Sequence, residues 1–228
     1  MFAAISQRNV PFRNLRMDGL ETNYFDFFLK FRVKLIPMPN IGKDVINFLA
    51  KIQVKFIILS GGNNVNPRLY DKNAGFDPDS SIKRDETEKA MIGYAVKNKL
   101  PVLGLCRGIQ FINVYFNGSL IKDLKGENYN HVGITHSLSI VDKKAEKFFG
   151  KKTFKVNSYH NQGIDKKCLS NELKAFAISD DGLIEGAFHP RYPIAGVIWH
   201  PERESPDNKI NEKIINAFLE RKLFWKEI

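Results

Sequence analysis

Fully apolar runs alternate with amphipathic stretches along the first half of the chain. The runs at residues 56–60 and 102–105 are typical of strands buried between two layers of helices. Two further runs, at residues 2–6 and 33–38, are also predicted strands. Between them, apolar residues recur at helical spacing, which predicts helices at residues 22–31, 43–51, 85–99 and from 107 to about 117.

The second half has a different pattern. Short apolar segments separated by turn residues, such as Asp180-Asp181-Gly182, predict strands, and only the last stretch, 213–225, is predicted to be helical. The strands are expected at residues 138–141, 153–158, 174–179, 183–188 and 194–199. We therefore expect an α/β fold in which a parallel, doubly wound sheet is followed by a β-rich return. No linker or repeat divides the chain, so residues 1–228 are expected to form one domain.

A cysteine lies at the junction of a predicted strand and a predicted helix. Cys106 follows the apolar run at residues 102–105 and is flanked by Gly104 and Gly108. The pattern Gly-x-Cys-x-Gly is the thiol counterpart of the nucleophile elbow, in which a sharp turn lifts the nucleophile from the sheet. The helix N-terminus favours a thiolate. Free cysteines are often buried core residues, but the two glycines favour a nucleophile.

Other polar residues also follow predicted strands. Gly61 and Gly62 come after the strand at residues 56–60, and parallel strands bring their carboxyl ends to one edge of a sheet, so these glycines should lie near Cys106. The backbone N–H groups of Arg107 and of the glycine pair could hold an oxyanion, although glycine pairs also form ordinary turns.

His200 follows the strand at residues 194–199, and Glu202 is placed to orient it as a general base. Alone, a histidine before Pro-Glu can equally be a surface residue.

Taken together, these motifs resemble the class I glutamine amidotransferase superfamily, whose fold is flavodoxin-like. Finer features are similar to its γ-glutamyl-γ-aminobutyrate hydrolase branch, peptidase family C26. The resemblance covers residues 5 to about 218. Besides the elbow, the glycine pair and the His-Pro-Glu segment, it rests on Asn66-Pro67 with Tyr70, Arg84-Asp85, Asn157 to Gln162, and Glu185 with His189-Pro190. The segment Asn63-Asn64-Val65 departs from relatives that have an acidic residue there.

The resemblance implies a role for each site residue. Cys106 would attack a γ-glutamyl amide and form a thioester, His200 would relay protons and Glu202 would orient His200. The N–H groups of Gly62 and Arg107 would form the oxyanion hole. The glutamyl head would contact Gln110, Ser158, Tyr159, His160 and Asn161. Gln110 lies one helical turn from Cys106, so it can face the same pocket, although a solvent-facing position is the alternative.

Composition narrows the cellular setting. Only two cysteines are present and no long apolar segment occurs, so we expect a cytoplasmic protein that is not bound to a membrane. The net charge of +10 comes from dispersed lysines without a nucleic-acid-binding motif, which favours a solvated surface or an anionic small substrate over nucleic acid. Lys, Asn, Ile and Phe are frequent, as in AT-rich bacterial genes. We expect no cofactor and no metal, and a monomer or homodimer.

Three functions compete. The leading interpretation is a stand-alone γ-glutamyl hydrolase. The second is a glutaminase subunit that supplies ammonia to a partner synthase, and the third is a non-enzymatic relative that binds or regulates. Family substrates include γ-glutamyl-γ-aminobutyrate, folate polyglutamates and γ-glutamyl-CDP-amidate of the route to capsule phosphoramidates. The positive charge favours a leaving group that carries phosphate, and Arg84, Arg68 and the lysine-rich strands are candidates to border the site.

Overall fold

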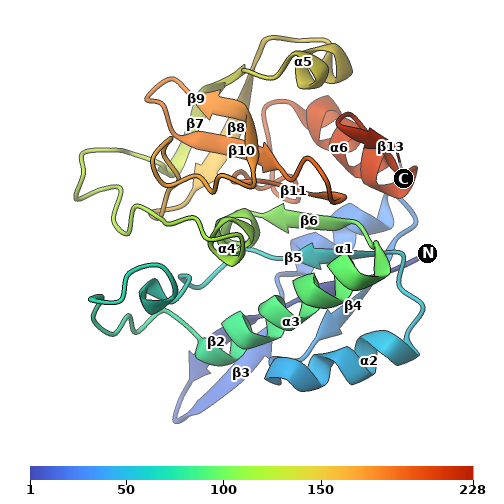
Figure 1. Cartoon of the computed structure of the whole chain (residues 1–228), viewed down its shortest axis with the longest axis vertical. Helices are drawn as coiled ribbons and strands as arrows, with labels where there is room; N and C mark the ends of the chain where they lie inside the picture. The colour runs from blue at the N-terminus through green and yellow to red at the C-terminus, as the bar shows by residue number, and fades with distance from the viewer. Residues whose placement is uncertain (228) are drawn as a thin grey trace.

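The computed structural model describes residues 1–227, and its largest feature is a nine-stranded sheet in the order β4-β1-β5-β6-β11-β10-β9-β7-β8 (Figure 1). The first five strands in that order are parallel. They are β4 (Lys34–Met38), β1 (Phe2–Ser6), β5 (Phe56–Leu59), β6 (Val102–Leu105) and β11 (Ile194–Val197). Their carboxyl ends therefore meet at one edge of the sheet.

The remaining four strands continue the sheet in antiparallel fashion. They are β10 (Ile184–Phe188), β9 (Lys174–Ser179), β7 (Val132–Ile140) and β8 (Thr153–Tyr159), drawn in yellow to orange in Figure 1. This confirms the predicted α/β fold with a mostly parallel sheet and a β-rich second half. The prediction of one domain stays a prediction, which the continuous sheet supports.

Helices cover both faces of the sheet because alternate residues of the central strands enter different cores. In β1, Ala3 and Ile5 pack in one core, and Ala4 packs in the other. The first core lies under α1 (Thr22–Leu29), α5 (Lys143–Phe149) and α6 (Asn208–Leu219). The second lies under α2 (Val45–Lys51), α3 (Ile82–Asn98) and α4 (Arg107–Tyr115). Short 3₁₀ turns occupy Gly42–Asp44 and Pro67–Leu69.

The predicted C-terminal helix is wrong at both ends. Helix α6 begins at Asn208 and ends at Leu219, and Arg221 adopts a left-handed conformation with φ of 56°. The chain then forms a small hairpin from β12 (Lys222–Leu223) and β13 (Lys226–Glu227). Aromatic packing explains the change, because Phe224 and Trp225 turn back onto Phe188 at centroid distances of 5.2 and 4.9 Å.

Besides the C-terminal hairpin, two further elements were not predicted from the sequence. A hairpin of β2 (Arg8–Phe12) and β3 (Leu15–Gly19) projects from the sheet at the lower left of Figure 1. Its residues are largely exposed, so no buried face imposes a hydrophobic alternation. The other element, α5, is short, but Asp142 caps it by accepting hydrogen bonds from the backbone of residues 144 and 145 at 2.9 Å. Strand β7 is also longer than predicted, because it starts at Val132.

Among residues 1–227, no helix combines the length and the apolar composition needed to cross a bilayer.

Candidate active site

The candidate site lies where β5, β6 and β11 end next to one another. Strands β5 and β6 are parallel neighbours, as are β6 and β11. Gly61 consequently lies against both Cys106 and His200: a Cβ built on it would lie 3.4 Å from Cys106 Cβ and 3.0 Å from His200 Cε1. This confirms the prediction that the glycine pair lies near the cysteine.

Cys106 occupies a sharp turn between β6 and α4. It has φ of 52° and ψ of −107°, an unusual conformation for a residue with a side chain. The flanking glycines are required sterically, because a Cβ on Gly104 would lie 2.6 Å from the backbone of Gly108, and one on Gly108 would lie 2.2 Å from the carbonyl oxygen of Leu59. The predicted elbow is therefore present, with the cysteine at the N-terminus of α4.

His200 and Glu202 form a buried pair. Nδ1 of His200 lies 2.6 Å from Oε1 of Glu202, so the carboxylate fixes the ring through that nitrogen. Asn157 holds the same segment from β8: its side-chain amide accepts from the N–H of His200 at 2.8 Å and donates to the carbonyl oxygen of His200 at 2.9 Å. The histidine is thus fixed through both its ring and its backbone.

Cys106 and His200 change each other's protonation. Burial raises the pKa of the Cys106 thiol, but the charge of His200 and its hydrogen bond to the thiol outweigh burial and lower that pKa overall. Burial lowers the pKa of His200, whereas Cys106 and Glu202 raise it, and the resulting pKa is about 10. These opposite shifts favour a thiolate–imidazolium pair, which is the nucleophilic form of a cysteine.

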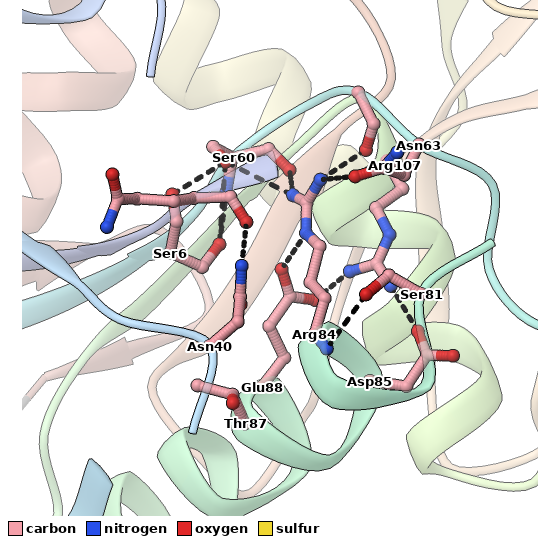
Figure 2. Close-up of polar contacts among 12 residues, drawn as sticks. Ser6, Asn40, Ser60, Asn63, Ser81, Arg84, Asp85, Thr87, Glu88 and Arg107 are labelled. Carbon is pink, nitrogen blue, oxygen red and sulfur yellow. Dashed lines mark hydrogen bonds and ion pairs between the residues drawn. The ribbon is translucent and has the colours of Figure 1, made fainter. Parts of the chain in front are cut away.

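Arg84, in the first turn of α3, orients the loop after β5 (Figure 2). Its guanidinium donates to the carbonyl oxygens of Ser60 at 2.7 Å, Gly61 at 3.0 Å and Gly62. In a trans peptide the C=O and N–H groups point in opposite directions. The N–H of Gly62 therefore points away from Arg84, and no hydrogen bond of residues 1–227 engages it.

Arg84 belongs to a buried quartet of charges that reaches both predicted oxyanion donors (Figure 2). Glu88 accepts from Arg84 Nε at 2.9 Å and pairs through its other oxygen with Arg107, whose guanidinium also pairs with Asp85. The charges of the two arginines and the two carboxylates cancel, so the quartet carries no net charge. Burial and the neighbouring Arg107 lower the pKa of Arg84 to about 10, so it stays charged at neutral pH. The quartet joins the Gly62 loop to the first residue of α4.

Three of the predicted substrate contacts lie in or against the end of β8. Tyr159 is nearly half exposed, and its ring centroid lies 5.7 Å from that of His200. Gln110 is buried and donates to the carbonyl oxygen of Gln162 at 2.7 Å. Buried His160 points Nδ1 at the same carbonyl, at 2.9 Å. Gln110 therefore supports the loop after β8 from the helix that begins at Cys106.

Two other predicted contacts are engaged elsewhere. The hydroxyl of Ser158 is buried and donates to the carbonyl oxygen of His131 at 2.7 Å. Asn161 donates to Asp123 at 2.9 Å and accepts from the N–H of Lys125 at 3.0 Å. Both side chains hold neighbouring loops in place, so their proposed contact with substrate stays a prediction.

The structure corrects one expectation about the positive groups near the site, whereas the proposed position of Arg68 stays a prediction. Arg84 is fully buried and its donors are occupied, so the expectation that it borders the site for an anion is wrong. Arg8, on the hairpin, lies over the loop instead: a Cβ on Gly62 would lie 2.9 Å from its Nε. Arg203 stacks on the Tyr159 ring at 4.7 Å. Glu21 accepts hydrogen bonds from Arg8 at 3.2 Å and from Arg203 at 3.0 Å.

Besides the residues of the buried quartet, two supporting residues were not among the predicted site residues. Asn157 was noted only as part of a family-like segment, and Tyr24 only as part of an apolar helix face. The hydroxyl of Tyr24 accepts from the N–H of Gly61 at 2.9 Å. Strand alternation groups Asn157 with the exposed residues Thr153, Lys155 and Tyr159, so the sequence carries no signal that Asn157 is buried.

Comparison with known proteins identifies the family of the chain. The peptidase C26 pattern matches residues 4–202, and the chain belongs to this family. The γ-glutamyl-CDP-amidate hydrolase of Campylobacter jejuni is 37% identical over 92% of this chain and 94% of that protein. The γ-glutamyl-γ-aminobutyrate hydrolase of Escherichia coli K12 is 31% identical over 69% of this chain and 67% of that protein. A glutamine amidotransferase structure from Thermotoga maritima shares the fold, with a TM-score of 0.60 at 15% identity, covering 96% of this chain and 83% of that one.

Proposed function

We propose that this protein is a cysteine-dependent hydrolase that cleaves the γ-glutamyl amide bond of a small γ-glutamyl conjugate and releases glutamate. The observation that carries the proposal is the position of Cys106 on its elbow beside the His200–Glu202 pair, which lowers the pKa of the thiol. Relatives that cover most of the chain and are named γ-glutamyl hydrolases support it.

In this proposal each site residue has one role. The Cys106 thiolate attacks the γ-carbonyl carbon, and the N–H groups of Gly62 and Arg107 stabilise the negative oxygen that develops. His200, protonated at that stage, gives its proton to the leaving amine as the thioester forms. It then accepts a proton from the water that attacks the thioester, and glutamate leaves. Glu202 stabilises the imidazolium through the 2.6 Å contact.

The leaving group is proposed to be anionic, as in γ-glutamyl-CDP-amidate or γ-glutamyl-γ-aminobutyrate. Contacts with the glutamyl head are common to all substrates, so selection of the amine falls to residues around the entrance. The candidates are Arg8, beside Gly62, and Arg203, on the Tyr159 ring; both pair with Glu21, on a chain with a net charge of +10. An attractive field raises the encounter rate of an anion and is screened by salt.

The test is a panel of γ-glutamyl amides assayed for released glutamate. It includes glutamine, γ-glutamyl-γ-aminobutyrate, γ-glutamyl-CDP-amidate and a neutral γ-glutamyl alkylamide, each at low and high ionic strength. We expect kcat/KM to be highest for an anionic amide and to fall with salt only for anionic amides. Arg8→Gln should reduce that salt dependence, whereas Arg13→Gln, which removes the same charge at the tip of the hairpin, should not.

The glutaminase alternative predicts a different outcome. Glutamine would then be the best substrate, and its hydrolysis would rise on addition of a synthase. Equal salt dependence for charged and neutral amides would reject the anionic leaving group while leaving the hydrolase proposal intact. Absence of glutamate release from every amide, with Cys106 still reactive, would reject the hydrolase itself.

A further inference from the structure

A fully buried carboxylate outside the proposed triad has no hydrogen-bond partner. Glu185 in β10 has an exposed fraction of 0%, and neither of its carboxylate oxygens is hydrogen-bonded. It lies where the pairing of β10 with β9 shifts register between Ile184 and Gly186. Such irregularities redirect a side chain. An unpaired buried carboxylate is costly, so a positive charge is expected at this position.

Three histidine rings surround this carboxylate. Nδ1 of His131 and Nε2 of His160 each lie 3.5 Å from Oε1 of Glu185, and Nε2 of His136 lies 3.7 Å from Oε2. The facing Nε2 atoms of His136 and His160 are buried and also have no hydrogen-bond partner. No lysine or arginine forms an ion pair with Glu185 among residues 1–227. The cluster therefore presents nitrogen and oxygen atoms to a shared space.

The opposite nitrogen of each ring is held by an acceptor. His131 Nε2 lies 2.9 Å from Asp181, His160 Nδ1 lies 2.9 Å from the carbonyl oxygen of Gln162, and His136 Nδ1 lies 3.3 Å from that of Ser137. Ser158 Oγ lies 3.4 Å from His131 Nδ1, but it donates to a backbone carbonyl at 2.7 Å. In the neutral tautomer with its N–H toward this acceptor, each ring would turn a lone pair toward Glu185. Metal-binding histidines are oriented in this way.

We propose that His131, His160 and Glu185 bind a divalent transition-metal ion of the Zn²⁺ class, with His136 as the available fourth ligand. Their ligand atoms lie within 4.8 Å of one another. Around Zn²⁺, ligands at about 2.0–2.1 Å in tetrahedral geometry lie roughly 3.4 Å apart, close to the separations from Glu185. Imidazole nitrogens combined with a carboxylate oxygen suit zinc. The proposal departs from the sequence-based expectation of no metal.

The ion would join three parts of the antiparallel sheet. His131 precedes β7, His160 follows β8 and Glu185 belongs to β10. Strand β10 pairs with β11, which leads to His200. Tyr159, the neighbour of His160 in the sequence, packs its ring against His200. The role inferred is structural, because all three ligands are buried. The inference does not depend on the proposed reaction.

The first test measures bound metal. Untagged Cys106→Ser protein is used, because a cysteine beside His200 could bind zinc by itself. The protein is treated with a chelator, desalted, loaded with ZnCl₂, desalted again and analysed for metal content. We expect about one Zn²⁺ per chain, a rise in Tm that excess chelator reverses, and a tetrahedral d–d spectrum when Co²⁺ replaces Zn²⁺. Less than 0.1 equivalent in protein with a native circular dichroism spectrum would overturn the proposal.

Variants then test the ligands. Glu185→Gln should abolish stoichiometric binding, and Asp181→Asn should weaken it by roughly tenfold through the orientation of His131. The control His189→Asn removes another buried histidine, which lies 3.9 Å from Glu172, and should keep full stoichiometry. If Glu185→Gln does not fold, the Zn²⁺ affinity of Asp181→Asn is the deciding measurement. This variant is expected to fold because the Asp181 carboxylate is partly exposed. Unchanged Zn²⁺ affinity in Asp181→Asn, or full Zn²⁺ binding in Glu185→Gln, would overturn the proposed site. The contacts between the histidines and Glu185 would then be ordinary hydrogen bonds without a metal.

Discussion

Arg84 donates a hydrogen bond of 3.0 Å to the carbonyl oxygen of Gly61. This contact, from the first turn of a helix to a loop at the edge of the sheet, fixes the peptide bond that carries the N–H of Gly62. Three consecutive carbonyl oxygens accept from the same guanidinium. The peptide between Gly61 and Gly62 therefore cannot flip without breaking these hydrogen bonds. A proposed oxyanion donor is thereby oriented by a residue that does not itself contact the reacting atoms.

Arg84→Lys should lower kcat much more than it raises KM. Lysine has one nitrogen in place of the planar fork and cannot bind all three carbonyl oxygens. Loss of one oxyanion donor typically lowers kcat by about 10²–10³. Steady-state kinetics checks this, together with the rate of Cys106 alkylation, which should be nearly unchanged because the thiol remains beside His200. Parallel loss of alkylation and activity would indicate general disruption of the site.

Cys106→Ser should remove hydrolysis by several powers of ten while the fold is kept, because the hydroxyl is a far weaker nucleophile in this position. Cys168 provides the matched control. Burial raises the pKa of the Cys168 thiol, and Cys168→Ser should keep activity within about twofold of the unmodified protein. Iodoacetamide followed by peptide mass mapping at neutral pH should label Cys106 first. Wild-type turnover by Cys106→Ser would exclude the proposed mechanism.

Activity should depend on pH through the Cys106–His200 pair. The thiolate needs a pH above the lowered pKa of Cys106, and the imidazolium needs a pH below the pKa of His200, which is raised to about 10. Thus kcat/KM should be lost as pH falls through the first pKa and again as pH rises through the second. His200→Ala removes the positive charge, so the alkylation profile of Cys106 should move to higher pH. An unmoved profile would contradict the pairing.

Glu202→Gln should cost less activity than His200→Ala. The amide can keep the ring in place, but it cannot stabilise the imidazolium as the carboxylate does at 2.6 Å. In other triads, removal of the third member costs roughly a hundredfold less than removal of the base. Comparison of kcat for both variants with that of His160→Ala checks the assignment. An inactive His160→Ala beside a normal His200→Ala would transfer the role of base to His160.

Much of the site could be predicted because its parts are local in sequence. Gly104, Cys106 and Gly108 define their turn within five residues, and the steric need for both glycines lies in the strand and helix that they join. The fold rule for parallel strands then places Gly61 and His200 at the same edge as Cys106, since each follows a buried strand. No long-range contact had to be known for this conclusion.

Tertiary packing decided the rest. Nothing near Arg84 in the sequence indicates that its side chain is fully buried, because an arginine in the first turn of a helix is usually solvated; its burial comes from the docking of α3 against the loop after β5. In the same way, His131, His160 and Glu185 meet only through the pairing and irregularities of the antiparallel strands. The sequence determined which residues could react, and the contacts between distant segments decided which charges hold them in place.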